Sequence, residues 1–275
     1  MKVYLSVDME GIGGISDPAP TDASDRRYPA AVALMVGETN AAIEGALAAG
    51  ATGIVVNDSH SAMFNLPPEA VHEAAVVVQG QKPWSMVAGA GPDEHFAVAL
   101  FVGYHARAGH PRGTIAHTYS MRPVETRLDG RPTGESGLNA LALGAWGIPV
   151  GLVSGDDALA EEVAEWLPWA ERIVVKTALG GSAAASTHPA VARAGVRAGA
   201  ERAVRRAAAG ELRTLDVGSP VVIEVDYGRA VVADHVAMIP GAERVGDRTV
   251  RLAYPDGLAA YRAFLTANRV ARAVD

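Results

Sequence analysis

Short apolar runs alternate with longer amphipathic or alanine-rich stretches along this chain. The short runs are rich in Val, Ile and Leu and end at Gly, Pro, Asp or Asn, a pattern typical of buried strands. The longer stretches have the length and the end residues of helices. We predict strands at 3–7, 53–57, 74–79, 96–104, 114–120, 149–154, 172–177, 221–226 and 249–254. We predict helices at 29–49, 134–146, 157–167 and 188–206, and a closing helix capped by Asp256.

This alternation predicts an α/β fold with a mainly parallel sheet flanked by helices. One antiparallel hairpin insertion is expected, because 124–128 and 131–133 flank the tight-turn pair Asp129-Gly130. The expected domains are a larger α/β domain at 1–210, which contains the candidate metal-binding and catalytic residues described below, and a smaller C-terminal α/β lobe at 211–275. A single integrated domain is the alternative.

Charge and cysteine content narrow the classes of partner and site. The formal net charge is −7 and the basic residues are dispersed, so neither nucleic acid nor a membrane surface is expected as a partner. The chain has no cysteine, so a metal site must be built from His, Asp and Glu. No apolar run is long enough to span a bilayer, and the first residues enter a strand rather than a secretion signal. We therefore expect a soluble, cytoplasmic protein.

Acidic and histidine side chains follow three of the predicted strands. Asp8 and Glu10 end the first strand, and residues i and i+2 of an extended chain point to the same side. His60 lies three residues beyond the second strand, and His105 comes at the end of the fourth. Because open parallel sheets bind ligands at the carboxyl ends of their strands, these four side chains are expected at one edge. Two acids held this close favour a shared proton or a cation, which indicates a metal site. A strand end with two solvated acids is the alternative.

Two further side chains are candidate functional residues near this edge. His117 shares one face of the predicted 114–120 strand with Ile115 and Tyr119, where it can act as an acid, a base or an electrostatic stabiliser. A half-buried strand histidine without function is the alternative. Glu135 opens a helix, where an acid favours the helix dipole whatever the function. The other histidines are expected to be ordinary surface or packing residues: His72, His95, His110, His188 and His235.

Four short motifs together carry a resemblance to a known family. They are SVDMEG at 6–11, VNDSH at 56–60, GYHAR at 103–107 and GESGLNA at 134–140. Their residues, order and spacing resemble the zinc-dependent D-aminopeptidases that are often encoded with dipeptide transporters. The resemblance implies an enzyme that releases N-terminal D-amino acids from short peptides, D-Ala-D-Ala among them. It also implies a homo-oligomer, expected as a decameric ring with its active sites in an inner channel.

The resemblance implies a role for each metal-binding position. Two zinc ions are expected per subunit, with Asp8 bridging them. Glu10 and His60 would bind one ion, and His105 and Glu135 the other. Five oxygen and nitrogen ligands without a thiolate suit a catalytic pair that keeps positions open for water and substrate. Carboxylate-rich sites also accept Mn or Co.

His117 matches the family's catalytic histidine, described there as the nucleophile. A metal-activated water is the other attacking group, in which case His117 stabilises the oxyanion or transfers a proton. Two other functions stay open: a metal-dependent phosphoesterase, and a non-catalytic peptide-binding partner of a dipeptide transporter. The sequence does not decide between D- and L-amino termini, because the shape of the pocket reads chirality.

Overall fold

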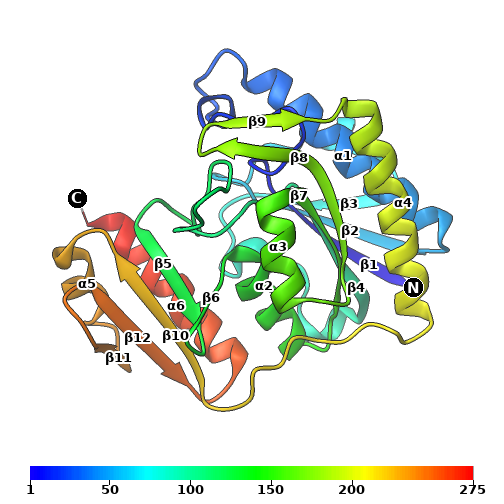
Figure 1. The fold of residues 1–275 in the computed structure, drawn as a ribbon. Helices are drawn as coiled ribbons and strands as arrows, with labels where there is room; N and C mark the ends of the chain where they lie inside the picture. The colour runs from blue at the N-terminus through cyan, green and yellow to red at the C-terminus, as the bar shows by residue number, and fades with distance from the viewer. Residues whose placement is uncertain (275) are drawn as a thin grey trace.

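The computed structural model describes residues 1–274, which form two β-sheets (Figure 1). In spatial order the larger sheet contains β3 (Ala75–Val78), β2 (Gly53–Asp58), β1 (Lys2–Val7), β4 (Phe96–Val102), β7 (Val150–Asp156), β8 (Glu171–Gly180) and β9 (Ala183–Ser186). Its strands are parallel except for β9, which pairs antiparallel with β8. The predicted fold class, a mainly parallel sheet flanked by helices, is confirmed.

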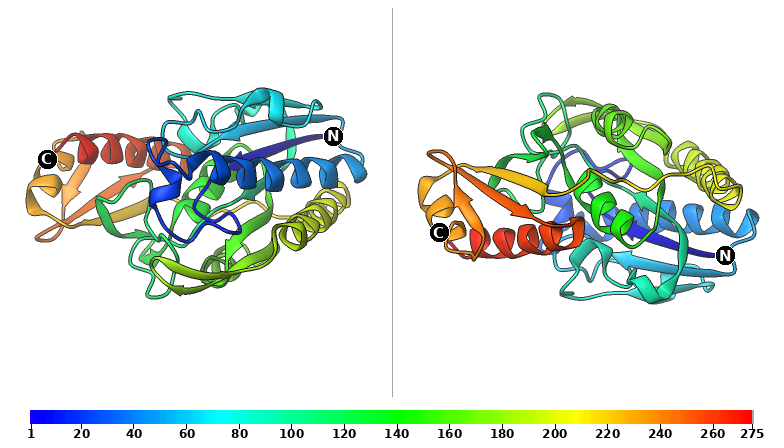
Figure 2. Two further views of the ribbon diagram at one scale, coloured as in Figure 1. Left: turned by 90° about the horizontal axis from the view of Figure 1, so that it is seen from above. Right: turned by 90° about the horizontal axis from the view of Figure 1, so that it is seen from below.

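Helices cover both faces of the larger sheet, because its central strands bury side chains on both sides. One face carries α1 (Tyr28–Ala48) and α4 (Pro189–Ala208), and the other carries α2 (Glu135–Ala145) and α3 (Asp157–Trp166). On β1, Val3, Leu5 and Val7 pack toward α1 and α4, whereas Tyr4 lies in the core on the opposite face. Figure 2 shows α1 and α4 side by side along the sheet.

The smaller sheet is antiparallel and lies beside the larger one (Figure 1). Its strands, in spatial order, are β11 (Ala242–Arg244), β12 (Thr249–Tyr254), β10 (Val221–Tyr227), β5 (Pro123–Leu128) and β6 (Arg131–Pro132). Helices α5 (Ala230–Val236) and α6 (Gly257–Ala273) pack on it, and α6 also contacts α2. Four short 3-10 helices complete the elements: η1 (Ala19–Thr21), η2 (Pro68–Ala70), η3 (Ser85–Val87) and η4 (Pro92–Glu94).

The predicted hairpin forms as β5 and β6, and it belongs to the smaller sheet. Strand β10, which comes after residue 210, pairs directly with β5. The chain therefore enters the smaller sheet twice, once before and once after residue 210. The division at residues 210 and 211 stays a prediction. Strands β9 and β11 and helix α5 were not predicted, because each is short and has little apolar periodicity.

Residues 114–120 form an irregular loop, so the predicted strand was wrong. Ile115 and Tyr119 have positive φ angles of 53° and 61°, which a strand does not allow. The loop is fixed by distant parts of the chain, for example by Asp156, whose Oδ2 accepts the Thr114 N–H at 2.9 Å. Apolar alternation in the sequence does not report such contacts.

The order of the strands creates a crevice at the end of β1. Strand β1 lies between β2 and β4. The strands that come later in the chain are added beyond β2 on one side, as β3, and beyond β4 on the other, as β7, β8 and β9. At such a switch point the segments that follow neighbouring strands diverge and leave space for a ligand. The segments after β1, β2 and β4 all reach this place. Within residues 1–274, no helix is both long enough and apolar enough to cross a lipid bilayer.

Candidate metal centre

The carboxyl end of β1 packs closely against the segment that follows β4. The Gly11 N–H donates to the Gly103 carbonyl at 2.8 Å, and a Cβ atom on Gly11 would lie 1.7 Å from the Tyr104 carbonyl oxygen. Only glycine permits this approach of two backbones. The contact brings Asp8 next to His105, and both side chains are buried.

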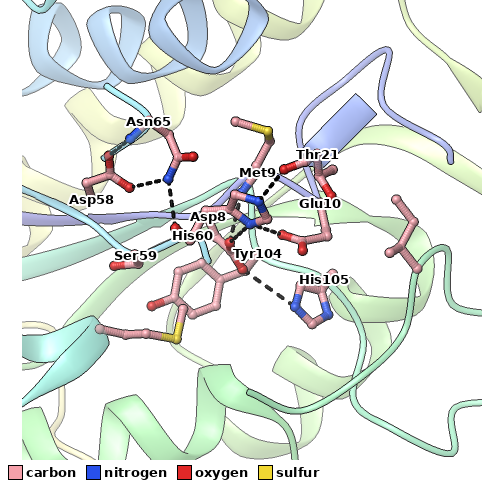
Figure 3. Close-up of polar contacts among 12 residues, drawn as sticks. Asp8, Met9, Glu10, Thr21, Asp58, Ser59, His60, Asn65, Tyr104 and His105 are labelled. Carbon is pink, nitrogen blue, oxygen red and sulfur yellow. Dashed lines mark hydrogen bonds and ion pairs between the residues drawn. The ribbon is translucent and has the colours of Figure 1, made fainter. Parts of the chain in front are cut away.

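A hydrogen-bonded turn after β2 holds His60 in place (Figure 3). Asp58 accepts the Asn65 amide and the Leu66 N–H, both at 2.8 Å, and Asn65 also donates to the His60 carbonyl at 2.7 Å. The Nε2 atom of His60 lies 2.9 Å from the Thr21 carbonyl, so Nε2 carries the proton and donates it there. Nδ1 is therefore the atom that a metal ion can reach, and it faces Asp8 and Glu10, the acids that follow β1.

His105 and Glu135 meet beside the 114–120 loop. The Nδ1 atom of His105 donates to the Ala106 carbonyl at 3.0 Å, so Nε2 is the atom that faces Glu135 Oε1, at 3.3 Å. Glu135 lies in the first turn of α2 and is buried, and its Oε1 also accepts the Tyr119 N–H at 2.6 Å. Backbone acceptors that fix a histidine tautomer in this way are typical neighbours of metal-binding histidines.

The two oxygens of Asp8 face two different pairs of side chains. Oδ1 lies 3.3 Å from His60 Nδ1, which in turn lies 2.9 Å from Glu10 Oε2. Oδ2 lies 3.5 Å from His105 Nε2, which lies 3.3 Å from Glu135 Oε1. A tetrahedral ion with bonds of ~2.0–2.1 Å holds its ligand atoms ~3.3 Å apart. The spacing therefore suits two ions that share one carboxylate.

The cluster carries an excess of buried negative charge. Burial, and after it the neighbouring Glu10 carboxylate, raises the pKa of Asp8 to about 8. Burial opposes the charged form of His105, but Glu135 and Asp8 outweigh it and raise the pKa of His105 to about 10. These side chains therefore need protons or cations to balance their carboxylates.

The donor atoms fit a metal ion. The Nε2 atom of His105 is buried and has no hydrogen-bond partner among residues 1–274, a costly arrangement unless a metal ion takes the place of its proton. Ligand atoms of Asp8, Glu10 and His105 lie within 4.8 Å of one another, as do those of His105, His117 and Glu135. Imidazole and carboxylate donors without thiolates suit zinc, manganese or cobalt.

His117 lies against the cluster as a free base. Its ring stacks on that of His105 with the centroids 4.1 Å apart, and its Nδ1 donates to the Ile115 carbonyl at 2.9 Å. Its Nε2 lies 4.0 Å from Glu10 Oε1 and 3.9 Å from Glu135 Oε1. Burial and then His105 lower the pKa of His117. At neutral pH, Nε2 therefore carries a lone pair that can accept a proton.

Lys176 on β8 anchors the loop that follows Glu10. Its ammonium group is buried and donates to the carbonyl oxygens of Glu10, Ile12 and Ile15. Burial lowers the pKa of Lys176 to about 8. Because a buried charge is tolerated only when it is well paired, these three bonds hold the ammonium and the loop together. A strand far away in sequence thus helps to fix the position of Asp8 and Glu10, the acids that follow β1.

The structure brings all six predicted site residues together: Asp8, Glu10, His60, His105, His117 and Glu135. All of them except His105 line a pocket of about 470 Å³, and His105 lies directly behind His117, on which its ring stacks. Within residues 1–274, none of the other five histidines lines this pocket. Sequence reasoning missed the residues that orient the six, among them Thr21, Asn65, Tyr119 and Lys176. They act through contacts between segments far apart in sequence, and no motif marks them.

Comparison with known proteins identifies the family. Residues 1–266 match the family model of peptidase M55, described as D-aminopeptidase. The chain belongs to this D-aminopeptidase family. A D-aminopeptidase from Bacillus subtilis (strain 168) is 37% identical over 279 residues, which covers 98% of each chain. Membership of the D-aminopeptidase family confirms the predicted enzyme class, a hydrolase of the aminopeptidase type.

A solved structure of a D-aminopeptidase has the same fold. It is described as the Zn-dependent D-aminopeptidase DppA from Bacillus subtilis, a self-compartmentalizing protease. The two structures match with a TM-score of 0.92 and 34% identity, over 100% of this chain and 99% of that one. The fold of this chain is thus shared over its whole length with a solved D-aminopeptidase structure.

Proposed function

We propose that this chain is a dinuclear zinc aminopeptidase that releases N-terminal D-amino acids from short peptides such as D-Ala-D-Ala. The observation that carries the proposal is the position of Asp8, whose two oxygens face separate histidine–carboxylate pairs. Asp8 would bridge the ions, with Glu10 and His60 on one and His105 and Glu135 on the other. The description of the related structure as Zn-dependent supports zinc, and Mn or Co are the alternatives.

The bound ions would supply Lewis acidity, which activates water and polarises the scissile amide carbonyl. The side chain of His117 would then move the proton. Its Nε2 accepts a proton from the attacking water and returns it to the leaving amine, while the Ile115 carbonyl keeps Nδ1 protonated. A direct nucleophilic attack by His117 is the alternative role, and it would leave a covalent adduct on Nε2.

The test is amine release from D-Ala-D-Ala and from L-Ala-L-Ala, with zinc-reconstituted protein beside a chelator-stripped control. Zinc-dependent release from the D,D peptide alone is the expected result. Release from the L,L peptide alone would keep the metallopeptidase and discard the D-specificity. Binding of either peptide without turnover would favour the peptide-binding alternative, and phosphate release from a generic phosphoester would favour a phosphoesterase.

The bridging role of Asp8 has its own test. Replacement of Asp8 by Asn keeps the shape of the side chain but removes the charge that two ions would share. We expect the variant to hold fewer than two zinc ions per subunit, measured by elemental analysis after desalting. Asp22→Asn is the matched control, because Asp22 lines the same pocket and is exposed, and within residues 1–274 its side chain accepts hydrogen bonds only from Ser24. Full zinc content in Asp8→Asn would exclude the bridge.

We also propose that the chain forms a homo-oligomer, with a decameric ring as the specific form. The related structure's description as a self-compartmentalizing protease supports an enclosed assembly. Light scattering coupled to size-exclusion chromatography measures the mass directly. A monomer at micromolar concentration would contradict the proposal. The cytoplasmic location stays a prediction.

A further inference from the structure

The pocket at the acid–histidine cluster extends along helix α6. Besides the cluster, its wall includes four residues of this helix: Leu265, Asn268, Arg269 and Arg272. Their spacing of three, one and three residues places them on a single stripe of the helix. A helix of the smaller sheet thus forms one wall of the pocket whose other wall carries the candidate metal ligands.

This wall brings positive charge to the pocket. Arg269 and Arg272 are exposed at its surface, and Lys82 lines the same pocket. Arg269 Nη2 donates to the Lys82 and Pro83 carbonyls at 3.2 and 3.4 Å, so the arginine is held next to the lysine segment. None of the three cations forms an ion pair with a carboxylate among residues 1–274. The Lys82 ammonium donates to the Asp58 carbonyl at 2.8 Å, so the backbone holds it rather than an acid. Three cations without a carboxylate partner around one pocket favour an anionic ligand.

Asn268 adds a buried donor between the cations and the cluster. The residue is only 6% exposed, and its Oδ1 accepts the Ser120 hydroxyl at 2.7 Å. Its Nδ2 makes no hydrogen bond to another residue among 1–274 and is open to the pocket, where a ligand can accept from it. Ser120 follows Tyr119, whose N–H binds Glu135. The free amide therefore lies on the pocket wall next to the loop that carries His117.

We propose that Asn268, Arg269 and Arg272, together with Lys82, bind the C-terminal carboxylate of a short peptide whose scissile amide lies at the acid–histidine cluster. The proposal rests on the aminopeptidase function proposed above and adds the group that the enzyme recognises at the other end of the substrate. A carboxylate accepts hydrogen bonds from guanidinium and amide donors at once. Asp22, the remaining carboxylate on the pocket wall, accepts hydrogen bonds from Ser24 and forms no ion pair with these three cations. Peptides with a free carboxyl end are then preferred over amidated ones.

The experiment compares kcat/KM for D-Ala-D-Ala and for its C-terminal amide. We expect the zinc-loaded protein to prefer the free acid. In Arg269→Gln/Arg272→Gln the acid-to-amide ratio should fall by about 10–100-fold, mainly through KM, because charge-assisted hydrogen bonds to the carboxylate are lost. Asn268→Asp, which has the same shape but repels a carboxylate, should lower the same ratio. Arg202→Gln/Arg205→Gln on α4 is the charge-matched control, since both arginines pair with surface acids and lie outside the pocket.

The outcomes separate this proposal from the aminopeptidase function. Equal cleavage of acid and amide by the unmodified protein would overturn carboxylate recognition while the aminopeptidase stands. An unchanged ratio in Arg269→Gln/Arg272→Gln would also overturn it, even if both rates fell. Cleavage of neither substrate by the zinc-loaded protein would remove the aminopeptidase function and this proposal with it. Circular dichroism and zinc content show whether each variant is folded.

Discussion

The side chain of His117 is kept neutral by its surroundings. Burial and the adjacent His105 ring lower its pKa, and the Ile115 carbonyl takes the Nδ1 proton. The Nε2 lone pair is therefore available at neutral pH. His117 also lies farther from the carboxylates than His105 does, at 3.9–4.0 Å rather than 3.3–3.5 Å. Its contribution should accordingly appear in turnover and not in zinc content.

Replacement of His117 by Ala tests this separation. We expect turnover of D-Ala-D-Ala to fall by ~10²–10⁴-fold, the usual contribution of a positioned acid or base. Zinc content should stay unchanged. His110→Ala is the matched control, because this loop histidine lies outside the pocket and only accepts N–H groups of Arg112 and Gly113. Normal turnover in His117→Ala with zinc bound would contradict the assignment.

Zinc binding should release protons from the site. Without zinc, Asp8 holds a proton below its raised pKa of about 8, and His105 holds one below about 10. A metal ligand must give up its proton, so zinc affinity should rise as the pH increases toward 8. Calorimetry in two buffers of different ionisation enthalpy measures the protons released, and we expect at least about one per subunit at neutral pH. An affinity that does not change between about pH 6 and 9 would contradict this account.

At the scale of the elements, the strand ends were predictable and the loops that orient the site were not. Asp8, His60 and His105 were predicted at one edge because the carboxyl ends of parallel strands coincide there, and the structure brings these side chains together. The 114–120 loop escaped prediction because its shape depends on Asp156 and other distant partners. The role of Lys176 could not be predicted for the same reason. A lysine on a strand is usually exposed, and only the tertiary structure buries this one.

Lys176→Met tests whether the bonds from Lys176 to the loop after Glu10 position Asp8 and Glu10. The substitution keeps an unbranched side chain but leaves three buried carbonyls without their donor, so the free energy of unfolding should fall by ~3 kcal/mol or more. Zinc affinity should fall by ~10–100-fold, as for other losses of support behind metal ligands. Titration with a zinc indicator and chemical denaturation measure the two effects. Lys2→Met, which removes an exposed pair with Glu94 and a cation–π contact with Phe96, should show neither.

Across the whole molecule, the smaller sheet completes the pocket that the larger sheet begins. The hydrophobic pattern predicted strands and a helix after residue 210, but it contained no information on where they dock. In the structure α6 packs against α2, and Tyr261 on α6 meets Asn139 on α2 and Tyr119 on the 114–120 loop. The hydroxyl groups of the two tyrosines lie 2.7 Å apart, and both bond to the Asn139 amide oxygen. The smaller sheet, through α6, and the larger sheet, through α2, are therefore linked by the loop that carries His117.

Tyr261→Phe removes one hydroxyl from this link while keeping the packing of the ring. We expect the free energy of unfolding to fall by ~1–2 kcal/mol, the cost of a lost buried hydrogen bond. Tyr119 should then be less well fixed, and because its N–H binds Glu135, zinc should dissociate faster than from the unmodified protein. Tyr254→Phe is the matched control, since its hydroxyl bonds only to the Pro240 carbonyl within the smaller sheet. Transfer of zinc to a chelator measures the release rate. Equal rates in the two variants would show that the link between the sheets does not reach the metal centre.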